Sequence, residues 1–176
     1  MAKVCLLYFD INTGYYPSLH HGLAYIIGAL KSHNHEIVLH HLTSQNDIAL
    51  AARFVKGKDI DLIALSFVSN QKLYVRSFFS SADITGKLVI SGGIHSTLLK
   101  EDVFNEFPKI NGVCVGEAEV ALINLCKKLD EKEEYESTFS FYFNTKEGVV
   151  KNPILPLQGI DDLSLPDYSL FNYKRR

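Results

Sequence analysis

The chain has 176 residues, 47% of them hydrophobic, which is enough for one domain with a single core. Its 18 basic and 20 acidic residues are spread along the chain and leave a net charge of −2. Neither a nucleic-acid-binding face nor a polybasic membrane-binding helix is therefore indicated. The start MAKVCLLYFD lacks a cleavage-site pattern, and no apolar run approaches membrane-spanning length. We expect a cytoplasmic protein whose partners include no nucleic acid and no membrane.

The predicted elements alternate along the chain, short apolar runs with amphipathic stretches. In chain order they are a strand at 3–9, a helix at 22–32, a strand at 36–42, a helix at 48–55, a strand at 62–67, a helix at 72–81, a strand at 87–91, a helix at 100–106, a strand at 112–115 and a helix at 117–131. This alternation is typical of a parallel sheet with helices on both faces. It predicts a doubly wound, Rossmann- or flavodoxin-like α/β domain with a five-stranded parallel sheet.

The pattern changes after Glu134. Two β-rich segments flank residues 144–148, and a glycine at this turn is typical of a hairpin. The following segment, LPLQGIDDLSLPDYSLFNYKRR, contains prolines and shows no periodicity, so it is interpreted as an extended strap or linker. We thus expect an α/β domain at 1–134, a small β-hairpin appendage at 135–158 and a linker at 159–176 toward a further domain.

The three cysteines are widely separated, at Cys5, Cys114 and Cys126. An iron–sulfur or zinc site needs closely spaced thiolates, so they are interpreted as buried small hydrophobic residues of a reducing compartment. His40 and His41 do not indicate a metal either, because adjacent residues on a strand point to opposite faces. The sequence predicts no metal site and no catalytic residue in this chain.

Four loops follow the predicted strands at the edge where an open parallel sheet binds its ligand. They are DINTGYYPSLHHG at 10–22, SFVSNQ at 66–71, SGGIHSTLL at 91–99 and VGEAE at 115–119. The first lacks the Gly-x-Gly-x-x-Gly turn of a dinucleotide site, since only Gly14 lies between Asp10 and Tyr16. A flavin site finds support only in Thr13, and a phosphoacceptor receiver needs an aspartate where Ser66 stands. These three common ligand types fit poorly.

Taken together, the loops resemble those of one family, the cobalamin-binding domain at the amino terminus of many radical S-adenosylmethionine (SAM) enzymes. The resemblance runs through YYPSLHHGLAYIIGALKSHNHEIVLHHL, DLIALSFVSNQ, LVISGGIHST and GVCVGEAE. It ends in LSLPDYSLF, a strap that precedes the radical domain in such enzymes. The order and spacing of the five motifs carry the resemblance, which covers most of the chain from Lys3 to Phe171.

The resemblance implies a corrinoid on the carboxyl edge of the sheet, with its nucleotide tail among the loops. The adjacent glycines of SGGIHS would let the tail pass close to the backbone, and the serine loop at 66–69 would lie beside it. The residues expected to bind the cofactor are Asn12, Tyr16, Leu19, Ser66, Val68, Ser69, Gly92, Gly93, His95, Gly116 and Glu117.

The resemblance also sets expectations for cobalt and for the rest of the enzyme. Other cobalamin proteins supply a histidine to cobalt from an Asp-x-His-x-x-Gly loop, but Asn12 stands at that position here. We therefore expect cobalamin to bind without a protein histidine ligand. The Cys-x-x-x-Cys-x-x-Cys motif of the radical domain is absent from these residues. A 4Fe–4S cluster and S-adenosylmethionine are expected in a C-terminal radical SAM domain of the same protein, a methyltransferase or related enzyme.

Plainer interpretations stay open beside this one. His95 is also explained as a residue that shapes the loop before a helix, and the paired glycines as a tight turn. Glu117 and Glu119 suit a first helical turn without any ligand. The functional alternative is a cofactor-free scaffold or protein-interaction domain of the same fold. A third interpretation, an enzyme with His95 and Glu117 as acid and base, lacks a nucleophile or a metal set.

Overall fold

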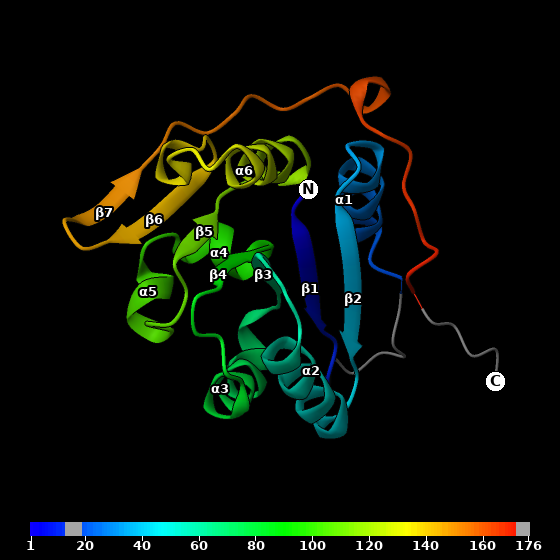
Figure 1. Cartoon of the computed structure of the whole chain (residues 1–176), viewed down its shortest axis with the longest axis vertical. Helices are drawn as coiled ribbons and strands as arrows, with labels where there is room; N and C mark the ends of the chain where they lie inside the picture. The colour runs from blue at the N-terminus through cyan, green and yellow to red at the C-terminus, as the bar shows by residue number, and fades with distance from the viewer. Residues whose placement is uncertain (13–18, 172–176) are drawn as a thin grey trace.

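The computed structural model describes residues 1–12 and 19–171, and its centre is one seven-stranded sheet in the order β2-β1-β3-β4-β5-β6-β7 (Figure 1). The strands are β1 (Lys3–Phe9), β2 (Glu36–Leu42), β3 (Leu62–Ser66), β4 (Leu88–Gly92), β5 (Gly112–Cys114), β6 (Phe141–Thr145) and β7 (Gly148–Lys151). The first five are parallel, as expected. Their order, 2-1-3-4-5, is that of a flavodoxin-like doubly wound fold.

The hairpin belongs to the same sheet, so the expected count of five strands is wrong for the sheet as a whole. β6 pairs antiparallel with β5, and β7 pairs antiparallel with β6. Phe141 and Phe143 of β6 are buried in the core, while Tyr142 between them is half-buried. A lone hairpin has no core in which to bury two phenylalanine rings, and this explains why it extends the sheet.

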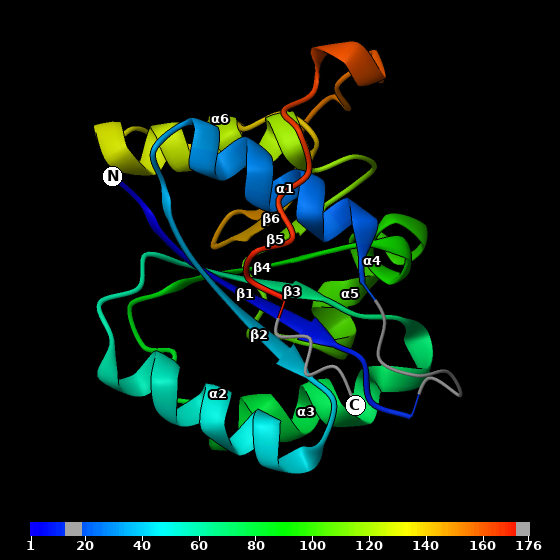
Figure 2. The same ribbon diagram turned by 90° about the vertical axis from the view of Figure 1, so that its right-hand side faces the viewer.

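Helices cover both faces of the sheet (Figure 2). On one face lie α1 (His21–Ser32) and α6 (Glu119–Glu131), and on the other lie α2 (Gln45–Gly57) and α3 (Lys72–Ser81). The segment after β4 contains two short helices, α4 (Ile94–Leu99) and α5 (Asp102–Glu106). Lys100 separates them with a φ of 51°. The loop expected at 91–99 is therefore mostly helix, and the helix expected at 100–106 begins two residues later.

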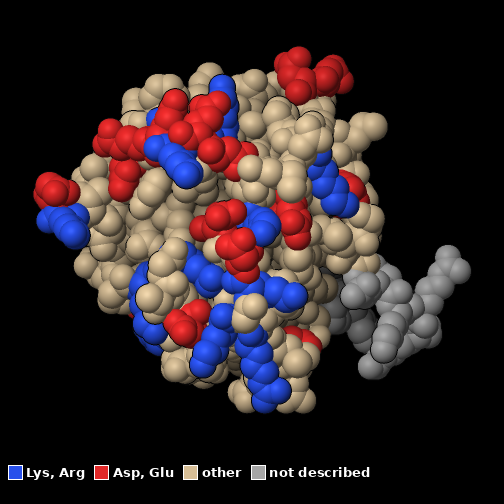
Figure 3. Space-filling model, in the orientation of Figure 1, with Lys and Arg blue, Asp and Glu red and all other residues tan. Residues whose placement is uncertain are grey.

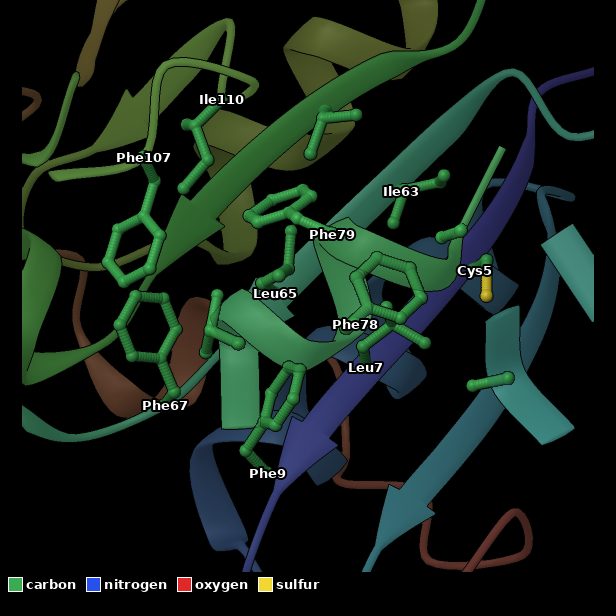
Figure 4. Close-up of a cluster of buried hydrophobic side chains, with 14 of the residues drawn as sticks. Cys5, Leu7, Phe9, Ile63, Leu65, Phe67, Phe78, Phe79, Phe107 and Ile110 are labelled. Carbon is green, nitrogen blue, oxygen red and sulfur yellow. The ribbon is translucent and has the colours of Figure 1, made fainter. Parts of the chain in front are cut away.

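Side chains alternate along the strands and divide the core into two clusters. Leu7 and Phe9 of β1 belong to the cluster under α2 and α3, where the rings of Phe9 and Phe78 meet edge to face (Figure 4). Leu6 of the same strand belongs to the opposite cluster, under α1 and α6. Helix α2 shows the matching 3.6-residue period, since its buried residues are Ile48, Ala51, Ala52 and Val55.

Residues 153–171, here called the strap, run across α1 (Figure 2). They contain no α-helix or strand, but the expected extended segment is interrupted by a short 3₁₀ helix at Ile160–Asp162. The closest approach is at Gly28, where a Cβ atom would lie 2.0 Å from the carbonyl oxygen of Leu165. Next to it, the Asp167 amide donates a hydrogen bond to an α1 carbonyl at 2.9 Å, and Lys31 Nζ lies 2.7 Å from Asp167 Oδ2. The strap is therefore docked on α1 by backbone contacts as well as by a salt bridge.

Charges are unevenly placed on the face seen in Figure 3. Asp and Glu gather in two groups, over α6 and near the centre of the view, with some Lys among them, whereas Lys and Arg gather over α2 and α3. The small net charge does not reveal this separation. Among the described residues, no helix is long and apolar enough to cross a membrane.

Candidate functional site

The carboxyl ends of the parallel strands meet at one edge of the sheet, and the polar loops follow them. β2 lies on the outer side of β1, whereas β4 lies on the opposite side of β3, so the strand order reverses between β1 and β3. Doubly wound folds bind their ligands outside such a topological switch point. Two cavities lie in this region.

The first, here called the inter-helix cavity, has a volume of about 270 Å³ and lies between the sheet, α1 and α6. Leu6, Ala64 and Ile90 of the strands contribute to its lining, as do Leu23 of α1 and Leu122 of α6. Its charged and polar side chains belong to His20, Ser66, Glu117 and Glu119. A mostly apolar chamber with a few polar groups is typical of a site for an organic ligand.

The second, here called the switch-point cavity, has a volume of about 300 Å³. It is lined by Tyr8, Phe9, His20, Ser66, Phe67, Val68, Gln71, Gly93 and Ile94. Three of these, His20, Ser66 and Gly93, also line the inter-helix cavity. The two cavities therefore adjoin at these residues, and one ligand could occupy both.

Gly93 keeps side chains out of the place where the cavities adjoin. Its φ of +87° is one that other residues rarely adopt. A Cβ atom there would lie 3.5 Å from Ser66 Oγ, so a larger side chain would project into the junction. Gly116, which lines the inter-helix cavity, also has a φ of +87°. Gly92 ends β4, and a Cβ atom there would be in ordinary contact with Cys114 at 3.7 Å.

His20 caps α1 and lines both cavities. Its Nδ1 accepts a hydrogen bond from the Leu23 amide at 3.1 Å, and its ring packs edge-on against Tyr8 with centroids 5.0 Å apart. Burial lowers the pKa of His20, which favours the neutral ring. Because Nδ1 accepts a hydrogen bond, the neutral ring carries its proton on Nε2.

Two titratable groups line the inter-helix cavity, the half-buried carboxyl group of Glu119 and the buried thiol of Cys114. Burial raises the pKa of the Glu119 carboxyl group, which folds back on the first turn of α6. Burial also raises the pKa of Cys114 to about 12, so the thiol stays protonated at neutral pH. Within residues 1–12 and 19–171, no group of three or more His, Cys, Asp or Glu residues could hold a metal ion.

His95 lies behind the loops and is only 1% exposed. Its Nδ1 is 2.9 Å from Ser69 Oγ, and its Nε2 is 3.7 Å from Glu106 Oε2. Burial lowers the pKa of His95. Glu117 lines the inter-helix cavity and His95 does not, so the two do not form an acid–base pair at one site.

The structure brings most of the predicted site residues together, but not all of them. Asn12 turns away toward α3, where its Nδ2 donates to Tyr74 Oη at 2.5 Å. Leu19 is exposed and lines neither cavity. Ser69 and His95 lie beside the cavities, and Tyr16 lies outside the described residues. The predicted residues that line one or both cavities are Ser66, Val68, Gly92, Gly93, Gly116 and Glu117.

Several lining residues were not predicted from the sequence. Leu23, Ile26 and Leu122 are apolar positions of amphipathic helices, and nothing in their pattern separates a cavity wall from ordinary core. His20 does carry a signal. It is a polar residue two positions before the GLAYI sequence and directly before His21, the first residue of α1, at the position of an N-cap.

No protein-family model and no curated protein matches the chain. Solved structures do match its fold. TsrM from Kitasatospora setae, a radical S-adenosylmethionine methyltransferase, is 17% identical in its complex with tryptophan and a SAM analogue, with a TM-score of 0.70 over 87% of this chain and 30% of that chain. Its structure with cobalamin and a [4Fe-4S] cluster is also 17% identical, with a TM-score of 0.69 over 94% of this chain and 31% of that chain.

OxsB, a cobalamin-dependent S-adenosylmethionine radical enzyme solved with aqua-cobalamin and S-adenosylmethionine, is 17% identical as well. Its TM-score is 0.71, over 89% of this chain and 23% of that chain. The proteins that share this fold thus include cobalamin-dependent radical SAM enzymes, the group that the loop motifs resemble. At 17% identity the similarity establishes the fold, and the chain spans less than a third of the length of these enzymes.

Proposed function

We propose that this chain is a cobalamin-binding domain that holds a corrinoid at the carboxyl edge of the sheet. The observation that carries the proposal is the pair of cavities at the switch point, which adjoin at Gly93, where a side chain is missing. The similarity in fold to OxsB, whose structure contains aqua-cobalamin, supports it. The order of the loop motifs supports it from the sequence alone.

The residues at the site fit such a ligand. The apolar inter-helix cavity suits the flat aromatic base of a nucleotide tail, and the junction at Ser66 and Gly93 suits a narrow sugar–phosphate segment. Gly116 and Glu117 would form the adjoining wall of the inter-helix cavity. Val68 would lie at the rim, where it lines the switch-point cavity.

We infer that cobalt receives no protein histidine here. Asn12 stands where other cobalamin proteins have the histidine, and its amide is engaged by Tyr74. Among the described residues that line the two cavities, His20 is the only histidine. The neutral His20 ring carries a proton on Nε2, and a protonated nitrogen has no lone pair for a metal. Contacts to the tail and the ring edge would therefore supply the affinity.

The bound corrinoid supplies methyl-transfer or electron-transfer chemistry. The residues of this chain bind it, orient it and exclude water from the inter-helix cavity. We propose that residues 1–134, with the hairpin at 135–158, form the corrinoid-binding unit, and that 159–176 leads to a C-terminal radical SAM domain with a 4Fe–4S cluster and S-adenosylmethionine. The much greater length of TsrM and OxsB supports this partner.

The test compares two valine substitutions at glycines with positive φ. Gly93→Val places a side chain at the junction of the cavities. Gly86→Val is the matched control, because Gly86 has a φ of +74° and nothing within 4 Å of its Cβ position. Both variants carry similar backbone strain, and circular dichroism checks that both fold. Hydroxocobalamin is titrated by absorbance, and we expect only Gly93→Val to lose affinity, by about tenfold or more.

Two results would contradict the proposal in different ways. A folded wild-type chain that binds no hydroxocobalamin at millimolar concentration would overturn corrinoid binding and favour the cofactor-free scaffold or protein-interaction domain. Equal affinity of wild type and Gly93→Val would leave the paired glycines as a turn only. Circular dichroism separates either result from a loss of folding, and Gly86→Val separates a loss of affinity in Gly93→Val from the effect of backbone strain.

A further inference from the structure

A row of four polar side chains connects the loop after β3 to α3 and α5. Ser69 Oγ lies 2.9 Å from Nδ1 of the buried His95, and the other ring nitrogen, Nε2, lies 3.7 Å from Glu106 Oε2. Lys72 Nζ donates to Glu106 Oε1 at 3.1 Å. Of the four, Ser69 is exposed, whereas His95 is fully buried.

The surroundings of His95 decide which of its nitrogens carries the proton. Nε2 and Glu106 Oε2 are both buried, and neither has a hydrogen-bond partner in the described part of the chain. Burial lowers the pKa of His95, so the ring is neutral at pH 7 and holds one N–H. A carboxylate paired with Lys72 is an acceptor, and it favours the tautomer with the proton on Nε2. Nδ1 is then the bare nitrogen, and Ser69 must donate its hydroxyl proton to it.

Among the described residues, the charged groups that act on His95 are Glu106 and Lys72. The ring of His95 packs in one cluster with the rings of Phe67 and Phe107, whose centroids lie 4.8 and 6.5 Å from its own. Arg76 stacks over the far ring, 5.6 Å from the centroid of Phe107. The cation of Lys72 faces the carboxylate, and its effect on the pKa of His95 adds to that of burial.

We propose that His95 fixes Ser69, the residue after the lining residue Val68, as a hydrogen-bond acceptor beside the switch-point cavity. We propose further that this makes the site select amide N–H groups over carboxylates on the corrin rim. The proposal rests on the corrinoid-binding function proposed above. With its proton committed to Nδ1, Ser69 Oγ has only lone pairs to offer. The N–H of a corrin side-chain amide can donate a hydrogen bond to Ser69 Oγ. A carboxylate oxygen is itself an acceptor, so it would face a second acceptor and form no hydrogen bond. His95 is thus a positioning residue that determines specificity without touching the ligand.

The tautomer is tested first, without any corrinoid. Long-range ¹H–¹⁵N correlation spectra of the ¹⁵N-histidine-labelled chain report which ring nitrogen carries the proton, and His95→Leu identifies the signals of His95. We expect a neutral ring with its proton on Nε2 at pH 7. A proton on Nδ1 would overturn the inference, because Ser69 would then accept from His95 and be free to donate to a ligand.

Selectivity is tested with hydroxocobalamin and with its three monocarboxylic acids, in each of which one corrin propionamide is a carboxylate. We expect the wild type to bind one isomer about tenfold more weakly than hydroxocobalamin, the loss of about one hydrogen bond. In His95→Leu the Ser69 hydroxyl can rotate and donate. The monocarboxylic acid that binds weakly to the wild type should therefore regain affinity, whereas hydroxocobalamin should not gain any. A merely structural role of His95 would weaken all four ligands alike.

Ser69→Ala keeps the test decisive if His95→Leu does not fold, because Ser69 is exposed and its removal leaves the core intact. It should weaken hydroxocobalamin and abolish the difference between the isomers. Ser80→Ala, at an exposed position of α3, is the matched control and should behave as the wild type. Unchanged isomer ratios in both Ser69→Ala and His95→Leu would reject the inference. Wild-type chain that binds no corrinoid would reject the proposed function instead, and the tautomer result would still stand.

Discussion

Replacing Gly28 by alanine should detach the strap from α1. In an isolated helix this change would be favourable by about 1 kcal/mol, because glycine is a poor helix former. Here the new Cβ atom would lie 2.0 Å from the carbonyl oxygen of Leu165 and 3.1 Å from its carbonyl carbon. Both are backbone atoms, so no rotamer change can relieve the clash. The strap must therefore move as a segment.

The size of the effect follows from what the strap would lose. One backbone hydrogen bond, from the Asp167 amide to Ala24, contributes about 1 kcal/mol. The salt bridge between Lys31 and Asp167 is partly exposed and adds little. Partial loss of the burial of Phe171, which is 6% exposed, adds about 1–2 kcal/mol. Set against the gain in helix propensity, the free energy of unfolding should fall by about 1–2 kcal/mol.

Gly57→Ala is the matched control, because Gly57 also lies in a helix and nothing is within 4 Å of its Cβ position. Urea unfolding followed by circular dichroism should show Gly28→Ala destabilised and Gly57→Ala unchanged or stabilised. Hydrogen exchange should show faster exchange of the Asp167 amide only in Gly28→Ala. A Gly28→Ala chain as stable as Gly57→Ala, with that amide still protected, would refute the reasoning.

Three further predictions concern protonation. Hydrogen bonds from Lys31 and Ser169 lower the pKa of Asp167 to about 2, so its stabilising effect is complete above its ordinary pKa of 3.8 and is lost as the pH falls toward 2. Asp167→Asn should flatten that part of a plot of urea midpoint against pH. Burial lowers the pKa of His35 and of His40, so the unfolded state takes up protons first and stability should decline as the pH drops below about 6.5. A urea midpoint that stays constant between about pH 7 and 5.5 would contradict this. Burial raises the pKa of Cys114 to about 12, so alkylation of its thiol by iodoacetamide should be slow at about pH 8, and slower still with hydroxocobalamin present.

The parallel strands β1, β3, β4 and β5 could be predicted because they are buried on both faces, so each is a mostly apolar run. β1 and β2 begin and end at the residues expected. The partner of the hairpin could not be predicted in the same way. The alternation around Tyr142 shows that one face of β6 is buried, but not that β5 lies beside it. Pairing of strands is a long-range choice that a local pattern does not contain.

The candidate site shows a similar division. Glycines such as Gly93 could be predicted because the need for a positive φ is a local property of the chain. The direction of a side chain is not local. His95 looks like a loop residue in the sequence, yet α4 begins directly after Gly93 and turns its ring into the core, against the rings of Phe67 and Phe107. Asn12 is likewise drawn toward α3 by Tyr74, which is distant in sequence.

Helix α1 connects the strap to the cavity, because the two occupy different faces of the same helix. Leu23 and Ile26 line the inter-helix cavity, whereas Gly28 and Lys31 form the seat of the strap. A ligand that fixes the position of α1 therefore also fixes the seat on which the strap docks. By thermodynamic linkage, a docked strap then raises the affinity of the cavity for the ligand. This coupling predicts that Gly28→Ala weakens hydroxocobalamin binding although Gly28 lines neither cavity, and that saturating hydroxocobalamin restores protection of the Asp167 amide. Affinity equal to that of Gly57→Ala, with the strap demonstrably released, would show that α1 keeps its position without the strap and that the two sites are independent.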